Sequence, residues 1–103
     1  MADPEPQITK AVAAIKVAAE SDLAISRSAV LEIEWQVRLI VGLTQSTDIE
    51  REGEYLVSRA LGRYVDRGPK PTIVLDARLQ GAVARFEFCL RKLGFLQPAT
   101  GDR

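Results

Sequence analysis

The chain has 103 residues, of which 47% are hydrophobic and 27% charged, with 14 basic and 14 acidic side chains. This composition predicts one folded domain and excludes a disordered chain, which would have fewer apolar residues and a larger net charge. Histidine is missing, which removes the commonest general base and zinc ligand, and the single cysteine, Cys89, excludes an intramolecular disulfide. We therefore expect a non-enzymatic protein without a cofactor, a metal or a small-molecule substrate.

The apolar runs and the N-terminal segment also limit the class of protein. Its apolar runs are shorter than the roughly 18 residues that a membrane span needs. Residues 1–6 are acidic and rich in proline, unlike a secretory signal. With the single cysteine, these features predict a cytoplasmic protein without a membrane partner. We expect residues 1–6 to be a flexible acidic arm, residues 7–96 a single helical domain and residues 97–103 a flexible tail.

The first predicted helix runs from Gln7 to about Leu23. Its apolar residues follow spacings of four, three and four, which place them on one face of a helix, and alanines between them favour the helical state. The stripe has little bulk, so this helix should pack closely against a neighbour while burying little area. It consists of Ile8, Val12, Ile15 and Ala19.

The segment 29–41 supports two interpretations. From Leu31 to Leu39, apolar and polar residues alternate without a break, which is typical of a half-buried strand. A strand would need a partner, and only residues 72–76 could supply one, whereas the leucine, glutamate and arginine content favours a helix. We expect a mainly α fold, a small helical bundle that oligomerises. The alternative is an α+β fold with strands near 29–41 and 72–76.

The third predicted helix begins at Thr47, which suits the N-cap position, and carries acidic residues in its first turns, where the helix dipole favours them. It ends at Gly68, a residue that readily adopts the left-handed conformation found just beyond a helix. The connector before it spans residues 42–47. Its apolar side consists of Ile49, Gly53, Leu56, Ala60, Leu61, Tyr64 and Val65.

The last predicted helix follows a proline-containing turn at residues 69–71 and stops at Gly94, after which Phe95 and Leu96 fold back. Apolar residues recur along it every three or four positions, which forms a seam suited to packing against another helix. The seam consists of Leu75, Leu79, Val83, Phe86, Leu90 and Leu93.

A basic stripe is the candidate for nucleic-acid binding. Arg59, Arg63 and Arg67 stand four residues apart on one side of the third helix, and Lys70 extends the row. Guanidinium groups in a row suit the phosphates of a nucleic-acid backbone. The alternative is a solvated face that meets the acidic N-terminal half, because residues 1–50 carry eight acidic and four basic side chains.

Surplus apolar surface is the candidate for protein contacts. Trp35 is the only tryptophan, a residue type enriched at interfaces, although packing in the core is the alternative. The predicted helices have more apolar faces than a monomer of this size is expected to cover, and an oligomer would cover them. The candidate interface residues are Trp35, Leu79, Val83, Phe86 and Leu90.

The order of parts from residue 35 to residue 103 is distinctive. A tryptophan-bearing helix is followed by a Thr-Asp helix start, a helix with aromatic and arginine residues that closes on glycine, and a proline-led last helix that ends Lys-Leu-Gly-Phe, with Pro-Ala-Thr close behind. This order resembles the small terminase subunits of tailed phages, whose long helix often ends Leu-Gly-Leu before Pro-Ala-Ser. The residues are Trp35, Thr47, Asp48, Tyr55, Arg59, Tyr64, Gly68, Pro71, Lys92, Leu93, Gly94, Phe95, Pro98, Ala99 and Thr100.

The resemblance implies a ring-forming, non-enzymatic protein that helps a larger motor protein, the large terminase, select viral DNA for packaging. The expected partners are then further copies of the chain, DNA and the motor. Members of that family commonly open with a basic arm, whereas residues 1–6 are acidic here. The alternative from another class is a small protein-binding regulator, such as an inhibitor or an antitoxin-like partner, that acts through its acidic N-terminal half.

Overall fold

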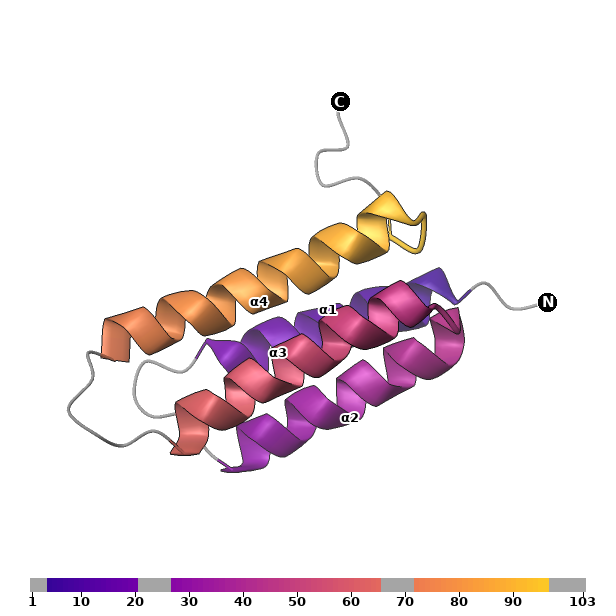
Figure 1. The fold of residues 1–103 in the computed structure, drawn as a ribbon. Helices are drawn as coiled ribbons and strands as arrows, with labels where there is room; N and C mark the ends of the chain where they lie inside the picture. The colour runs from indigo at the N-terminus through magenta and orange to yellow at the C-terminus, as the bar shows by residue number, and fades with distance from the viewer. Residues whose placement is uncertain (1–3, 21–26, 66–71, 97–103) are drawn as a thin grey trace.

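The computed structural model describes residues 4–20, 27–65 and 72–96, and the side chains of residues 63–65 and 72–76 lie outside that description. The described residues form four helices and no strand. Consecutive helices run antiparallel and pack into a bundle (Figure 1). The predicted small helical bundle is confirmed. The helices are α1 (Glu5–Ala19), α2 (Arg27–Thr44), α3 (Thr47–Val65) and α4 (Thr72–Lys92).

Helices α2 and α4 lie at opposite corners of the bundle. Each of them packs against both α1 and α3 (Figure 1). Of these four contacts, the one between α1 and α4 is the smallest. A helix at a corner buries the side that faces its two neighbours and leaves the opposite side in solvent. The outward side of α2 is therefore a surface of the molecule.

The alternative fold with strands near 29–41 and 72–76 is wrong, because both segments are helical. The alternation in α2 arises from two apolar faces on one helix. Leu31, Trp35 and Leu39 are exposed, and residues between them in the sequence point to the opposite side and are buried. Two opposite faces of a helix interleave along the chain and imitate a period of two. The buried residues are Val30, Ile33, Val37 and Ile40.

The core lies along the axis of the bundle and receives large side chains from all four helices. Fully burying one such side chain contributes about 1.5–3 kcal/mol. α1 contributes isoleucines and small alanines, which allow its neighbours to approach closely. The largest fully buried side chains are Phe86, Ile8, Ile15, Ile33, Ile40, Ile49, Leu56, Leu79 and Leu90.

Helix α1 begins at Glu5, two residues before the predicted start. Proline is tolerated in the first turn of a helix, because the N–H group it lacks would have no partner there. Pro6 therefore belongs to α1, which corrects the prediction of an arm over residues 1–6. The helix ends at Ala19, and the predicted extension to Leu23 lies outside the described residues, as do residues 1–3 and 97–103.

The turn between α2 and α3 is shorter than predicted and consists of Gln45 and Ser46. The Ser46 hydroxyl accepts a hydrogen bond from the Ile49 N–H at 3.4 Å. Ser46 is therefore the N-cap, and Thr47, the predicted cap, is the first residue of the helix. Gln45 adopts a left-handed conformation, with φ of 49°, and its N–H donates to the Val41 carbonyl at 2.9 Å. This is the αL form of helix C-cap.

The end of α4 follows the prediction. Gly94 has φ of 87°, and the Phe95 N–H donates to the Leu90 carbonyl at 2.8 Å. This six-to-one hydrogen bond around a left-handed glycine is the Schellman motif. The chain then turns back, and Leu96 is buried against the core.

Candidate protein-binding face on helix α2

Three large apolar side chains of α2 lie on the side that faces away from the core. Leu31, Trp35 and Leu39 stand four residues apart and are 52%, 68% and 40% exposed. Single exposed apolar residues are common on protein surfaces, but a row of them on one helix marks an interaction site. We call these three residues the outer face of α2.

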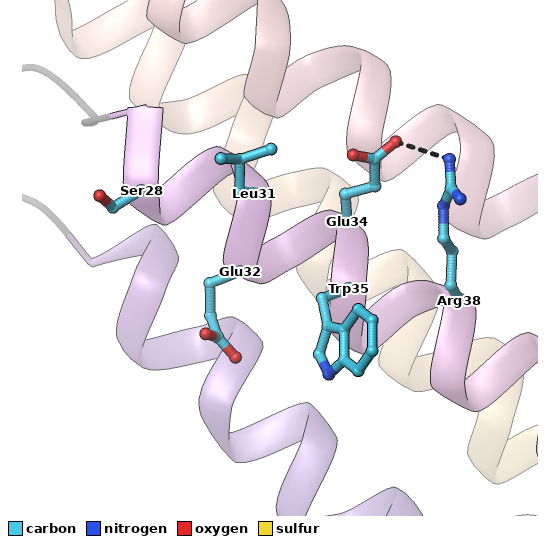
Figure 2. A pocket seen from close by; sticks show the side chains of 6 residues that line it. All are labelled: Ser28, Leu31, Glu32, Glu34, Trp35 and Arg38. Carbon is cyan, nitrogen blue, oxygen red and sulfur yellow. Dashed lines mark hydrogen bonds and ion pairs between the residues drawn. The ribbon is translucent and has the colours of Figure 1, made fainter.

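The outer face borders a shallow depression, and Figure 2 shows that all of the residues lining it come from α2. A depression formed by a single helix has no opposite wall, so it does not enclose a small molecule. It offers an open surface to another protein element. A second depression, between α2 and α3, shares Glu34 and Arg38 with it. The lining residues of the first are Ser28, Leu31, Glu32, Glu34, Trp35 and Arg38.

Polar pairs follow both edges of the outer face. On one edge, Arg38 Nη2 lies 3.1 Å from Glu34 Oε2, a pair that Figure 2 draws as a dashed line. On the other edge, Gln36 Nε2 donates to Glu32 Oε2 at 2.5 Å. At 100° per residue, these pairs lie on either side of Trp35. An apolar strip with a polar rim is typical of a helix that packs against a partner.

The predicted interface residues fall into two groups. Trp35 is exposed as an interface residue must be. The others are at most 4% exposed, because the apolar seam of α4 packs against the other helices of the same chain. Their prediction as contacts to a second chain is wrong, because α3, and to a smaller extent α1, covers these side chains within the chain. The four buried candidates are Leu79, Val83, Phe86 and Leu90.

Leu31 and Leu39 were missed as candidate interface residues. The sequence feature that could have identified them is their spacing, because Leu31 stands four residues before Trp35 and Leu39 four residues after it. That spacing places the three on one side in a helix and in a strand alike, so it does not distinguish the two. The spacing therefore had to be combined with burial of the other apolar residues of α2 to identify the outer face.

The structure describes one complete side chain of the predicted basic stripe, that of Arg59. Its guanidinium lies 4.9 Å from the centre of the Tyr55 ring, and the residue is half-buried. Arg85 of α4 stacks on the same ring at 5.0 Å, and its Nε lies 2.6 Å from Glu52 Oε1. Stacking of arginine on an aromatic ring is stabilising by itself. The contact of Arg59 lies within α3, whereas Arg85 joins α4 to α3 through the same ring.

The remaining predicted nucleic-acid contacts are not placed by the structure. The backbone of Arg63 belongs to α3, but its side chain lies outside the described residues. Arg67 and Lys70 also lie outside them. The stripe therefore stays a prediction, and Arg59 is its one member whose side chain the structure describes.

Cys89 lies partly buried in α4 beside a third depression, between α3 and α4. Burial raises the pKa of its thiol, and the negative charges of Glu52 and Asp48 raise it further, against the opposing effect of Lys92. The thiol form therefore predominates at neutral pH, and a thiol is a much weaker nucleophile than a thiolate. Within the described parts of the chain, no group of three potential metal ligands lies together.

No helix in the described ranges is both long enough and apolar enough to cross a membrane. Comparisons of the chain with protein-family models, with curated proteins and with solved structures found no match.

Proposed function

We propose that this chain is a non-enzymatic helical adaptor that works through protein contacts at the outer face of α2 and assembles with further copies of itself. The observation that carries the proposal is the exposure of Trp35, 68%, at the centre of a row of apolar residues. Tryptophan is the residue type most enriched among those that dominate binding energy at protein interfaces.

The energetic argument is the hydrophobic effect. Removing apolar surface from water contributes about 25 cal/mol per Å². The core is formed by side chains from all four helices, and the exposed surface of the outer face contributes nothing to the folding of a single chain. A partner that covers these three apolar residues would remove their exposed surface from water, which explains why they lie on the surface.

A finer role follows from the resemblance to small terminase subunits. We propose that the adaptor helps a larger motor protein select viral DNA for packaging. A helical bundle with an exposed binding face is compatible with such a role, and the basic stripe supplies the candidate DNA contacts. These contacts are Arg59, Arg63, Arg67 and Lys70.

The experiment for the DNA contact is retention of double-stranded DNA across a salt titration. Each phosphate contact steepens the fall of log affinity with log salt by about 0.9, so replacing Arg59, Arg63 and Arg67 with alanine should weaken binding and flatten the slope. Because Arg59 also packs on Tyr55, the double variant Arg63→Ala/Arg67→Ala keeps that contact and separates DNA binding from folding. Binding that ignores salt, or that both variants retain unchanged, would contradict the DNA role.

The second candidate function is a small regulator that binds one other protein. The same outer face favours it, and the glutamates Glu32 and Glu34 along its edges would select a basic partner. Light scattering separates the two functions. A mass well above the 11.3 kDa of one chain supports the self-assembling adaptor. A monomer at every concentration contradicts it and leaves the regulator.

A further inference from the structure

A second exposed surface lies on α4, at the corner of the bundle opposite α2. Phe88 is 66% exposed, whereas Phe86 and Leu90, two residues before and after it, are buried, so its ring points away from the core. Small exposed residues continue the same side of α4 toward the start of the helix. We call Ala77, Gly81, Ala84 and Phe88 the outer face of α4.

The outer sides of α2 and α4 carry an aromatic residue and a glycine in opposite order. On α2, Trp35 comes seven residues before Gly42, and on α4, Gly81 comes seven residues before Phe88. Seven residues are close to two helical turns, so each ring lies on the same side of its helix as the glycine. A Cβ atom added at either glycine would meet nothing within 4 Å, so both glycines border open space.

This order lets the two faces fit together. If α4 of a second copy lies parallel to α2 with Gly81 opposite Trp35, then Phe88 lies opposite Gly42. Each large ring then fills the space over a residue without a side chain. An antiparallel pair would place Phe88 over Ser28, another small residue, so size alone does not fix the direction, and charge decides between the two.

The edge of the α2 face that borders α3 is acidic. The depression between α2 and α3 is lined by Glu34, Glu50 and Glu54 together with Arg38. Arg38 pairs with Glu34, while Glu50 and Glu54 form no ion pair with any side chain that the structure describes. Two carboxylates on this edge are therefore available to a basic partner.

The edge of the α4 face that borders α3 is basic. Arg78, Arg85 and Lys92 stand seven residues apart along it and are exposed. Arg85 pairs with Glu52 of α3, whereas Arg78 and Lys92 have no ion-pair partner among the described side chains. The charge on this edge is opposite to that on the edge of the α2 face.

We propose that the outer face of α2 is covered by the outer face of α4 of a second copy, with the two helices parallel. The inference rests on the proposed self-assembling adaptor and names its contact surfaces. Within one bundle α2 and α4 run in the same direction at opposite corners (Figure 1). The second copy therefore keeps the orientation of the first, with α3 on the same side, and the basic edge meets the acidic edge.

Other pairings of these faces lack this charge match. In an antiparallel pair of α2 and α4, the basic edge would lie on the α1 side of α2, away from Glu50 and Glu54. Two α2 faces packed antiparallel would bring their acidic edges together, and two α4 faces their basic edges. Because the favoured contact joins unlike faces, it repeats from copy to copy.

Leucine at either glycine tests the contact. Gly42→Leu fills the space for Phe88 and Gly81→Leu the space for Trp35, and open surroundings at both leave the fold intact. Each variant alone should lose assembly, because every contact contains one altered face. An equimolar mixture should form pairs of twice 11.3 kDa, because one unaltered face of each kind remains. Gly62→Leu on α3, outside both faces and also in open space, is the matched control.

Charge reversal tests the direction. Lys92→Glu and Glu50→Lys each place like charges where the two edges meet and should weaken assembly about fivefold. The double variant should recover the original assembly, because the edges again carry opposite charges. Single variants that assemble as the unmodified chain does would contradict the parallel arrangement.

The readout is the mass from analytical ultracentrifugation over a range of concentrations, with circular dichroism to compare helix content. Two monomeric glycine variants that pair on mixing, beside a control that assembles normally, establish the contact. If either glycine variant assembles normally, if the mixture stays monomeric, or if the control also loses assembly, this contact is wrong while the self-assembling adaptor stands. If the unmodified chain is monomeric at every concentration, both are wrong.

Discussion

Gly53 of α3 lies directly against Val37 of α2. A Cβ atom built on Gly53 would lie 2.6 Å from Val37 Cγ1, closer than such atoms approach in proteins, and 3.3 Å from Phe86 Cε1 of α4. Val37 is buried and branched at Cβ, so it cannot easily turn away. The absence of a side chain at Gly53 is what lets three helices meet at this level of the bundle.

Replacing Gly53 with alanine should therefore destabilise the bundle. The higher helix propensity of alanine stabilises by about 1 kcal/mol, but overpacking a tight core costs about 1–3 kcal/mol, and we expect a net loss of stability. Gly62→Ala is the matched control, because a Cβ there meets nothing within 4 Å and the substitution should stabilise α3. Urea denaturation of both variants measures the difference. Equal stabilisation by the two would contradict the close packing at Gly53.

Removal of the ring should cost much stability at Phe86 and almost none at Trp35. Phe86 is 1% exposed, so Phe86→Ala should lower the free energy of unfolding by about 3–5 kcal/mol. Trp35→Ala should change it by less than about 0.5 kcal/mol when measured on dilute protein, because the ring is exposed in a single chain. Thermal unfolding at low concentration gives both values. A large loss of stability in the Trp35→Ala variant at low protein concentration would mean that the ring packs within its own chain.

Glu87 of α4 links α1 to α4 through a charge pair. Its Oε1 lies 2.8 Å from Lys16 Nζ, and its other oxygen accepts a hydrogen bond from Arg91. Burial acts to raise the pKa of Glu87, but the hydrogen bonds from Lys16 and Arg91, together with their positive charges, outweigh it and lower the pKa below its ordinary value of 4.5. The folded state therefore favours the ionised carboxylate.

The pH dependence of stability follows from this shift. A carboxylate whose pKa is lowered by folding contributes stability above its unfolded pKa, and the contribution is lost as the pH falls through the folded pKa. Glu87→Gln should cost about 1 kcal/mol at pH 7. Its difference from the unmodified chain should shrink as the pH falls below 4.5 and vanish once the pH is below the lowered pKa of the folded state. Urea titrations at pH 7 and in acid measure this. Glu54→Gln, on an exposed residue, is the control, and a pH-independent cost at Glu87 would contradict the ion pair.

Gln45 holds a backbone conformation that suits glycine. A residue with a side chain in the left-handed region costs about 1–2 kcal/mol, and glycine avoids that cost while losing some entropy on folding. Gln45→Gly should therefore raise the free energy of unfolding by about 0.5–1 kcal/mol, whereas Gln45→Ala, which keeps a Cβ, should not. Chemical denaturation of the two variants compares them. A destabilised glycine variant would mean that the Gln45 side chain is needed at the turn.

The apolar residues of α3 and α4 repeat at helical spacing over many residues, which made the core residues of these helices predictable. Ile49 and Leu56, like Leu79 and Phe86, recur at helical spacing and are buried as expected. Leu61 was placed on the same side of α3 but is 49% exposed, because it lies about 120° around the helix from Ile49 at 100° per residue.

The two faces of α2 were harder to predict. A strand and a helix with two apolar faces produce the same alternation, and only the packing of α1 and α3 decides which side is buried. The same limit applied to the interface residues. The sequence indicated a surplus of apolar faces, but the seam around Phe86 is covered within the chain and the face around Trp35 is not, because α2 occupies a corner of the bundle.

The single tryptophan makes the central claim directly measurable. If a second copy covers the outer face of α2, the emission of Trp35 should shift to shorter wavelength and become harder to quench with acrylamide as the protein concentration rises, in step with an increase in mass. An emission spectrum and a quenching constant that stay the same while the mass increases would show that assembly uses another face. Unchanged emission together with the mass of one chain, 11.3 kDa, would show that the chain does not assemble at all.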